Sequence, residues 1–302
     1  MTIPARLHLA SAQYDIGRFA NWSEYEAKIR RWVAEAAAGG AELLLFPEYH
    51  SMELASLLPE AEQRSLTGQL SALQAWLQPF LALHGDLARQ HRVHILAGTF
   101  PVRLQDGGYR NRAHLFTPEG AIGHQDKVQM TRFENERWGI QAGRELKVFH
   151  TACGPIGVAT CYDSEFPVLV RRLVEAGAEL LLVPSCTDTL AGYHRVRIGC
   201  QGRALENQCY VVQASTVGDA PWSEAVDVNV GAAAVYTPVD YGFPDNGVLA
   251  EGSLNRPGWV HAQLEPARLD QVRRQGQVFN HRDWPAQHRL DHTGVAQVSL
   301  GG

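Results

Sequence analysis

Six short apolar segments recur along the chain, each bounded by glycine, proline or polar residues. Runs of this length with such boundaries are typical of strands that are buried on both faces. The six segments are LHLASAQ (7–13), ELLLFPE (42–48), HILAGTF (94–100), GPIGVATC (154–161), ELLLVPS (179–185) and YVVQAST (210–216).

Longer segments with helical spacing of apolar residues lie between these strands. They span 21–38, which stops at Gly39-Gly40, then 69–91, and 166–176, which stops at Gly177. Pro79 lies inside the second segment and is expected to kink or interrupt that helix. The alternation of buried strands with helices predicts an α/β fold.

One pattern occurs twice. AGGAELLLFPE (38–48) and EAGAELLLVPS (175–185) both run from a helix end through glycine, an acid and three leucines to a proline. This near repeat indicates two similar halves within one fold. Because no linker is visible, we expect a single domain over 1–302, with loops and short strands over 218–258. The segment 266–302 is expected to be a C-terminal tail that packs on the body or on a partner subunit.

Composition narrows the classes of partner. The chain has 302 residues, 45% of them hydrophobic and 20% charged, which is ordinary for a globular protein. A formal net charge of −5 and scattered basic residues argue against a nucleic-acid-binding protein. No apolar run approaches the roughly 20 residues of a membrane-spanning helix, and no signal peptide is visible. A small-molecule ligand fits best, with no membrane and no nucleic acid as partner.

The five cysteines, an odd number, form no paired framework. This predicts reduced thiols and a cytoplasmic location. Histidine pairs at 91 and 94 and at 288 and 292 have no neighbouring cysteine or acid in a recognisable metal motif, so no metal site is predicted. No nucleotide-binding loop is present, and no cofactor is predicted.

Three residues could together perform nucleophilic catalysis. Glu48 and Cys161 each end an apolar strand, where sheets of α/β proteins open into ligand crevices. Lys127 follows a hairpin-like segment whose turn is Thr117 to Gly120. A carboxylate can take and return the thiol proton, the thiolate can attack a carbonyl or nitrile carbon, and an ammonium can stabilise the oxyanion. We expect a helix N-terminus near Phe166 and the lysine to lower the pKa of the thiol.

The order of these motifs, FPE, a lysine after a hairpin and then CYD, resembles the nitrilase (carbon–nitrogen hydrolase) superfamily. The resemblance extends from AQYD near residue 12 to about residue 255 and includes PSCT (184–187) and RALENQCYVV (203–212). It implies a four-layer αββα sandwich that assembles into a homodimer or a higher homo-oligomer. It also implies that Glu48 is the general base, Lys127 stabilises the oxyanion, Cys161 is the nucleophile, and Tyr162 offers its backbone N–H.

Relatives often have a second glutamate between the lysine and the cysteine. Glu134 and Glu136 both occupy this interval, and the context ENERWG favours Glu136. CYDSEFP has Glu165 where many relatives carry arginine. CYDSEFP together with TRFENERWG resembles a less-studied bacterial branch, some members of which are fused to an acetyltransferase domain.

The expected function is hydrolysis of a non-peptide C–N bond in a small amide, through a cysteine thioester and with release of ammonia or an amine. Nitrile or N-carbamoyl hydrolysis, or acyl transfer, would use the same triad. A non-catalytic binding protein is less favoured because no triad member is missing, and a redox protein would need a resolving cysteine, for which Cys153 is the candidate. Residues that flank the catalytic positions could line the pocket: Tyr49, His50, Tyr109, Asn111, Tyr162 and Thr187, with Cys186 close by.

Overall fold

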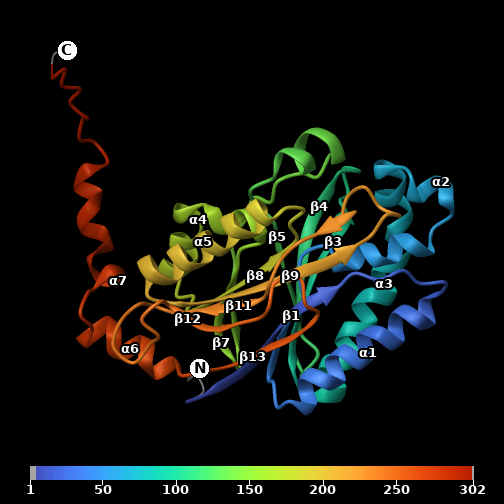
Figure 1. The fold of residues 1–302 in the computed structure, drawn as a ribbon, viewed down its shortest axis with the longest axis horizontal. Coiled ribbons are helices and arrows are strands. Elements are labelled where there is room, and N and C mark those ends of the chain that lie inside the picture. The colour runs from blue at the N-terminus through green and yellow to red at the C-terminus, as the bar shows by residue number, and fades with distance from the viewer. Residues whose placement is uncertain (1–4, 301–302) are drawn as a thin grey trace.

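The computed structural model describes residues 5–300 and shows one continuous arrangement of strands with helices on two sides (Figure 1). The central strand order is β5-β4-β3-β2-β1-β9-β8-β7-β6. The first half contains β1 (Leu7–Asp15), β2 (Leu43–Leu45), β3 (His94–Arg103), β4 (Tyr109–Phe116) and β5 (Ile122–Asp126). The second half contains β6 (Val148–Thr151), β7 (Gly154–Val158), β8 (Leu180–Ser185) and β9 (Tyr210–Asp219).

The two halves meet where β1 and β9 run parallel, with Gln13 opposite Ser215 and Asp15 opposite Val217. We call this junction the seam. The near repeat occupies matching positions on either side of it, because β2 pairs with β1 and β8 pairs with β9. Further short strands complete the sheets: β10 (Val228–Asn229), β11 (Ala234–Tyr236), β12 (Val248–Glu251) and β13 (Gly258–Leu264).

Four principal helices cover the outer faces of the two halves (Figure 1). On one side lie α1 (Trp22–Ala38) and α3 (Leu66–His91), and on the other lie α4 (Pro167–Glu175) and α5 (Leu190–Asn207). Asn21 caps α1 by accepting the Glu24 N–H, as expected for a helix that begins at this point. Shorter helical segments are α2 (Glu60–Gln63), α6 (Pro266–Gln275), α7 (Asn280–Asp283), the 3₁₀ segments η1 (His50–Leu57), η3 (Cys161–Glu165) and η4 (Trp284–Leu290), and the π-helical η2 (Phe133–Trp138).

Three separate apolar cores define four layers. Leu44 and Leu181 pack in the two cores beneath the helices. The flanking leucines of the same strands, such as Leu45 and Leu182, point the opposite way into a third core. Alternate residues of a strand face opposite sides, so the triple leucine serves both faces of each sheet. The expected αββα sandwich is confirmed.

The six predicted strands are all present, with shifted ends. The strand predicted over 42–48 contains only Leu43–Leu45, and the one predicted over 154–161 ends at Val158, before the cysteine. The Thr117–Gly120 turn is also present, since the Gly120 N–H donates to the Thr117 carbonyl at 3.0 Å. The expectation of loops and short strands over 218–258 is confirmed as well.

The expected interruption at Pro79 does not occur. Helix α3 runs unbroken from Leu66 to His91 with Pro79 inside it. Pro79 has no N–H to donate to the carbonyl of Ala75, four residues earlier. Because Ala75 is exposed, water can donate to this carbonyl instead. Buried Leu73 and Phe80 hold the helix against the sheet on both sides of the proline.

The C-terminal tail divides into two parts. Leu269 and Val272 of α6 are buried, and Arg171 of the body stacks over Trp284 at 4.8 Å from the ring centroid. Beyond η4, residues 291–300 are exposed and extend away from the body (Figure 1). Packing on the body is therefore confined to the first part of the predicted tail.

All five cysteines are free thiols. The reducing, cytoplasmic location inferred from them stays a prediction. Between residues 5 and 300, no helix is both long and apolar enough to cross a membrane.

Candidate active site

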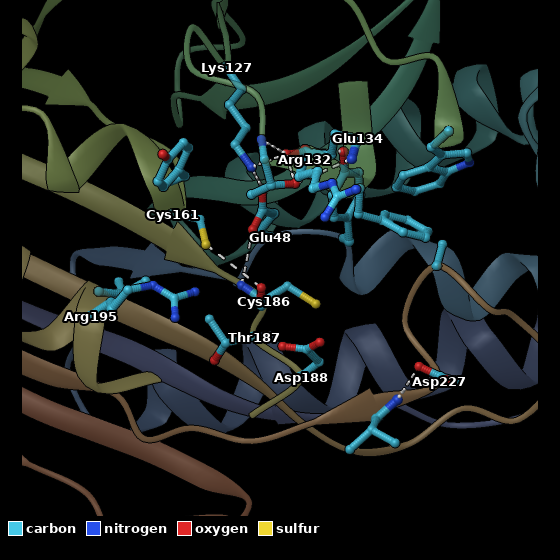
Figure 2. A pocket seen from close by; sticks show the side chains of 18 of the residues that line it. Glu48, Lys127, Arg132, Glu134, Cys161, Cys186, Thr187, Asp188, Arg195 and Asp227 are labelled. Carbon is cyan, nitrogen blue, oxygen red and sulfur yellow. Dashed lines mark hydrogen bonds and ion pairs between the residues drawn. The ribbon is translucent and has the colours of Figure 1, made fainter. Parts of the chain in front are cut away.

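The three predicted catalytic residues converge on one cavity of about 390 Å³ (Figure 2). Each comes soon after a strand: Glu48 after β2, Lys127 directly after β5, and Cys161 after β7. Glu48 and Lys127 belong to the first half and Cys161 to the second. The site therefore draws on both sides of the seam.

Cys161 lies on a sharp turn with φ of 49°, in the left-handed region that side chains other than glycine rarely adopt. Two hydrogen bonds hold this turn: the Asp163 carboxylate accepts the Thr160 N–H at 3.1 Å, and the Asp163 N–H donates to the Thr160 carbonyl at 2.9 Å. The Asp163 carboxylate also accepts the N–H of Val128 at 3.1 Å and that of Gln129 at 2.6 Å. One buried acid thus connects the cysteine turn to the segment that carries Lys127.

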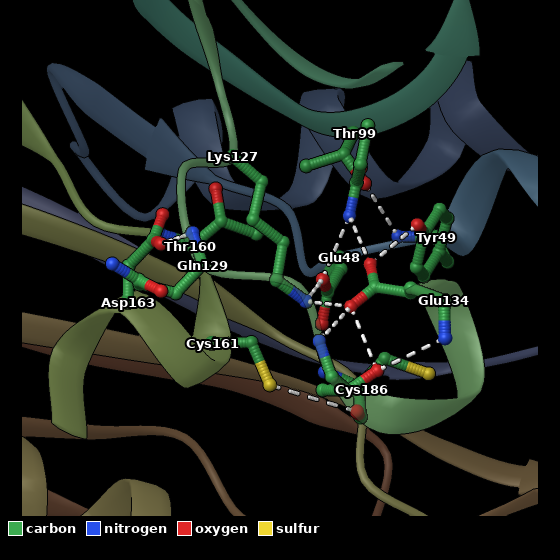
Figure 3. Close-up of polar contacts among 12 residues, drawn as sticks. Glu48, Tyr49, Thr99, Lys127, Gln129, Glu134, Thr160, Cys161, Asp163 and Cys186 are labelled. Atoms are coloured by element: carbon green, nitrogen blue, oxygen red, sulfur yellow. Dashed lines mark hydrogen bonds and ion pairs between the residues drawn. The ribbon is translucent and has the colours of Figure 1, made fainter. Parts of the chain in front are cut away.

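Lys127 is buried, with 1% of its side chain exposed, between two carboxylates (Figure 3). Its Nζ lies 2.8 Å from Glu48 Oε1 and 2.7 Å from Glu134 Oε2. An ammonium between two acids is strongly stabilised in its charged form. Burial alone would lower the pKa of Lys127. The negative charges of Glu134 and Glu48 outweigh this effect and raise the pKa well above its ordinary value.

The second glutamate of the site is Glu134, so the expectation of Glu136 is wrong. Glu136 lies on the surface and pairs with Arg132 at 2.8 Å, with 54% of its side chain exposed. Glu134 is buried, and it accepts hydrogen bonds from the Tyr49 hydroxyl at 2.7 Å and the Thr131 hydroxyl at 2.8 Å. Within the π-helical segment η2, Glu134 is buried and Glu136 is exposed, so the two glutamates point to different sides.

A local signal for Glu134 was present in the sequence. Thr131 lies three residues before it, which is the spacing of a capping box. In the structure the Glu134 N–H donates to Thr131 Oγ1, while Glu134 Oε2 accepts the Thr131 N–H at 2.9 Å. Glu136 has arginine four residues before it, which is the spacing of an exposed helical ion pair.

The two site glutamates have opposite pKa shifts. Burial raises the pKa of Glu48. The positive charge of Lys127 offsets this rise only in part, and the negative charge of Glu134 adds to it. Burial also acts to raise the pKa of Glu134, but the charge and hydrogen bond of Lys127, with those from Thr131 and Tyr49, hold it below its ordinary value. Glu134 therefore stays ionised, whereas Glu48 is the group suited to gain and lose a proton.

The expected lowering of the Cys161 pKa is wrong. Burial raises the pKa of the thiol well above its ordinary value, the Glu48 charge adds to this, and Lys127 opposes it only in part. The thiol donates to the Cys186 carbonyl at 3.7 Å, and both Cys161 and Glu48 line the same cavity. The raised pKa favours the neutral form of the thiol, which lies beside a glutamate that could accept its proton.

The proposed substrate-contacting residues Tyr49, Tyr162 and Thr187 all line the cavity, as does Cys186. His50, Tyr109 and Asn111 do not. The His50 ring lies in the core, where Nε2 contacts the Ala97 carbonyl at 2.7 Å, and the Tyr109 hydroxyl accepts from Arg103. Asn111 lies behind the two carboxylates rather than at the cavity wall.

Sequence reasoning missed the charged rim of the cavity. Glu165, the residue that departs from the arginine of many relatives, lies on the rim and faces Arg195 of α5 at 3.6 Å. Burial raises the pKa of Glu165, which Arg195 partly offsets. Asp188 and Asp227 line the same side of the cavity as Thr187 (Figure 2).

The redox interpretation is contradicted by the fold. Cys153 precedes β7 and Cys161 follows it, so the strand separates them by roughly 15 Å at about 3.3 Å per residue. A disulfide needs Cα atoms within about 7 Å. Cys153 instead contacts His94 Nδ1 at 3.2 Å, at the opposite end of the strand from the cavity. Within the described residues 5–300, no three histidine, cysteine or acidic side chains are grouped as metal ligands.

Solved structures with the same fold support this architecture. The chain superposes on the Caenorhabditis elegans NitFhit protein with a TM-score of 0.76 and 21% identity, covering 94% of this chain and 67% of that one. It superposes on a carbon-nitrogen hydrolase from Helicobacter pylori with a TM-score of 0.75 and 18% identity, covering 96% and 97% of the two chains. The amidase from Nesterenkonia sp. AN1 superposes with a TM-score of 0.68 and 21% identity, covering 97% and 99%.

Sequence comparison gives the family. The chain is 32% identical over 271 residues to the probable hydrolase YhcX of Bacillus subtilis, which covers 90% of this chain but only 52%, about half, of that longer protein. It is 31% identical over 259 residues to the deaminated glutathione amidase of Synechocystis, covering 82% of this chain and 88% of the relative. The model of the carbon-nitrogen hydrolase family matches residues 8–274. The chain therefore belongs to the carbon-nitrogen hydrolase family of the nitrilase superfamily.

Proposed function

We propose that the protein hydrolyses a non-peptide C–N bond of a small amide by way of a thioester on Cys161. The observation that carries this proposal is the junction of one buried lysine, two carboxylates with opposite pKa shifts, and a thiol at the wall of one cavity. The family supports hydrolytic chemistry at a C–N bond. The roles of individual residues are inferred from the geometry.

In acylation, Glu48 takes the Cys161 proton as the sulfur attacks the amide carbon. The carbonyl oxygen gains negative charge, which Lys127 Nζ and the Tyr162 backbone N–H stabilise. When the tetrahedral intermediate collapses, Glu48 gives the proton to the nitrogen, the C–N bond breaks, and ammonia or an amine leaves. Glu134 keeps Lys127 charged and in place throughout.

In deacylation, Glu48 removes a proton from water as the water oxygen attacks the thioester carbon. The C–S bond then breaks, the sulfur regains the proton from Glu48, and the acid is released. A glutamate with a raised pKa suits both roles, because its proton affinity lies closer to neutral pH than that of an exposed acid.

A solved mutant of the Nesterenkonia sp. AN1 amidase shows covalent addition of the acetamide moiety of fluoroacetamide at its active-site cysteine. By analogy, Cys161 is the atom to test for covalent chemistry. Nitriles, N-carbamoyl compounds and acyl transfer to an amine would use the same groups, so they belong in the same experiment.

The experiment is ammonia release from a panel of small amides, nitriles and N-carbamoyl compounds by wild type and Cys161→Ala. We expect release from at least one amide by the wild type and none by the variant. Mass spectrometry of rapidly quenched wild type should show an acyl adduct on the peptide that contains Cys161. Turnover that persists in Cys161→Ala would refute the nucleophile assignment.

A further inference from the structure

The two oxygens of the Glu48 carboxylate have different partners. Oε1 accepts a hydrogen bond from Lys127 Nζ at 2.8 Å (Figure 3). It accepts a second one from Asn111 Nδ2, also at 2.8 Å. Oε2 accepts the backbone N–H of Cys186 at 3.1 Å. A carboxylate oxygen offers about two lone-pair sites, so Oε1 is saturated and Oε2 keeps one free.

The orientation of the Asn111 amide follows from its surroundings. Its Nδ2 group has two hydrogens, one for Glu48 Oε1 and one for Glu134 Oε1 at 3.2 Å. With the amide reversed, its oxygen would face both carboxylates. Asn111 Oδ1 is buried and has no hydrogen-bond partner among the residues that the structure describes. The amide is thus held for its two donors, even though its acceptor is left unsatisfied.

The backbone of Asn111 is also held in place. It is fully buried in β4, opposite Pro101 of β3, and its carbonyl accepts the Lys127 N–H at 2.9 Å. One residue therefore fixes the main chain of the lysine and both carboxylates that the lysine touches. Because Asn111 does not line the cavity, it would act through Glu48 rather than on a substrate.

We propose that Asn111 is a positioning residue that, together with Lys127, reserves Oε1 of Glu48 as a pure acceptor, so that every proton transferred in the reaction passes through Oε2. The inference rests on the proposed function. In acylation the thiol proton moves to Oε2 as the S–C bond forms, and then to the nitrogen as the C–N bond breaks. In deacylation a water proton moves to Oε2 as the O–C bond forms, and then to Sγ as the C–S bond breaks.

The test measures the proton transfer without the unknown substrate. Alkylation of Cys161 by iodoacetamide, followed by mass spectrometry as a function of pH, reports whether Glu48 can accept the thiol proton. Asn111→Ala removes a hydrogen bond to the ionised carboxylate, so the acid limb of the profile should move up by about one pH unit. Asn111→Asp keeps the shape but adds a third acid, and should move the limb further.

Ser51→Ala is the matched control. It removes a different buried hydrogen bond of the same region, from Ser51 Oγ to the Thr99 carbonyl at 2.7 Å, without touching either carboxylate. The acid limb of this variant should coincide with that of the wild type. If Asn111→Ala folds, as judged by circular dichroism, and its limb also stays in place, the inference is overturned.

A second measurement uses the wild type alone, should the Asn111 variants not fold. The side-chain ¹⁵N–H resonances of Asn111 should titrate with the same midpoint as the acid limb, and resonances insensitive to pH would overturn the inference. Failure of the proposed function has a different signature. It appears as a wild-type Cys161 that resists alkylation at every pH, or as no ammonia release from the panel.

Discussion

At the scale of single residues, the site is organised by what each carboxylate accepts. The Glu134 carboxylate accepts hydrogen bonds from the side chains of four residues: Lys127, Thr131, Tyr49 and Asn111. So many donors favour the ionised form. Glu48 shares the lysine but accepts from fewer donors, so we expect Glu48 rather than Glu134 to exchange protons.

This difference predicts the behaviour of two neighbouring variants. Glu134→Gln should remove the charge that holds Lys127 and reduce the turnover number by about 10²–10³, the range for loss of one electrostatic stabiliser. Glu136→Gln changes the same residue type two positions along, on the surface, and serves as the control. Steady-state kinetics on the best substrate of the panel makes the comparison; equal rates for the two variants would contradict the assignment.

Removing the lysine should affect stability as well as turnover. Lys127→Ala leaves Glu48 and Glu134 buried with no cation between them, and breaking such a buried pair costs about 3–5 kcal/mol of unfolding free energy. Urea unfolding measures this loss. Part of it should be recovered on acidification, since protonating one carboxylate relieves the repulsion.

Lys147→Ala provides the contrast. Lys147 is about one-third exposed and lies 3.7 Å from Glu145, so its loss should change the unfolding free energy by less than about 1 kcal/mol. A loss of similar size in both lysine variants would argue against the special placement of Lys127.

Sequence reasoning found three residues that meet at the cavity but not their environment. Glu48, Lys127 and Cys161 could be identified because motif order reports them directly. The burial of Glu134 beside Lys127 depends on the π-helical segment η2, which the spacing of apolar residues does not predict. The raised pKa of Cys161 depended on burial and on the closeness of Glu48, which are properties of tertiary packing.

At the scale of elements, the helix α3 and the sheet enclose three buried histidines, His50, His84 and His114. Burial lowers the pKa of His84 to about 4 and those of His50 and His114 to about 3. In the unfolded chain a histidine takes up a proton below about pH 6.5, whereas these three histidines stay neutral in the folded protein down to about pH 4. The unfolded state therefore gains protons first, and the free energy of unfolding falls as the pH drops from 6.5 towards 4.

The variant His84→Phe should reduce this pH dependence. Its ring packs 4.3 Å from Phe80, between centroids, and could be replaced by another aromatic ring. Between pH 7 and pH 5 the wild type should lose roughly 2 kcal/mol more than the variant, from 1.36 kcal/mol per unit below pH 6.5. Urea unfolding at the two pH values measures the difference.

One control variant accompanies that experiment. His150→Phe removes an exposed imidazole and should keep the wild-type dependence. Burial raises the pKa values of Glu53 and Asp163 to about 7. These two acids therefore have the opposite effect: their contribution to the free energy of unfolding increases as the pH falls below 7. Since they are present in every protein compared, the difference between His84→Phe and wild type isolates the histidine. Parallel curves would contradict the prediction.

Elements with strong periodicity were predictable, whereas irregular ones were not. The triple-leucine strands and the helix beginning at Asn21 follow directly from pattern and capping. The strand β13 was missed although Val260, Ala262 and Leu264 alternate towards the core, because it lies between the segment expected to form loops and short strands (218–258) and the expected tail (266–302). The interruption expected at Pro79 is wrong, because the tertiary packing of α3 outweighs the loss of one hydrogen bond.

At the scale of the whole molecule, the outer surface of the second half carries exposed apolar side chains. Ile198 and Leu205 are seven residues apart on α5, and therefore on one face, and are 67% and 44% exposed. Val168 of the neighbouring α4 is 66% exposed. Groups of apolar residues on a surface mark interaction sites, so we expect a second copy of the chain to cover this face.

The variant Ile198→Glu should shift the protein towards the monomer in sedimentation velocity, because a charge at the centre of an apolar interface is costly to bury. Ile122→Glu places the same charge on an exposed apolar position of β5, in the other half, and should leave the mass unchanged. A wild type that sediments as a monomer at all concentrations would contradict the expected oligomer.

The seam has a consequence for the life of the chain before folding is complete. Glu48 and Lys127 precede residue 150 and Cys161 follows it, and they meet only when β9 has paired with β1. Domains of this size pass through partly structured species as they fold. A nascent or partly unfolded chain therefore holds its thiol apart from the carboxylate proposed to activate it, so we expect the proposed reactivity towards amides only in the finished structure.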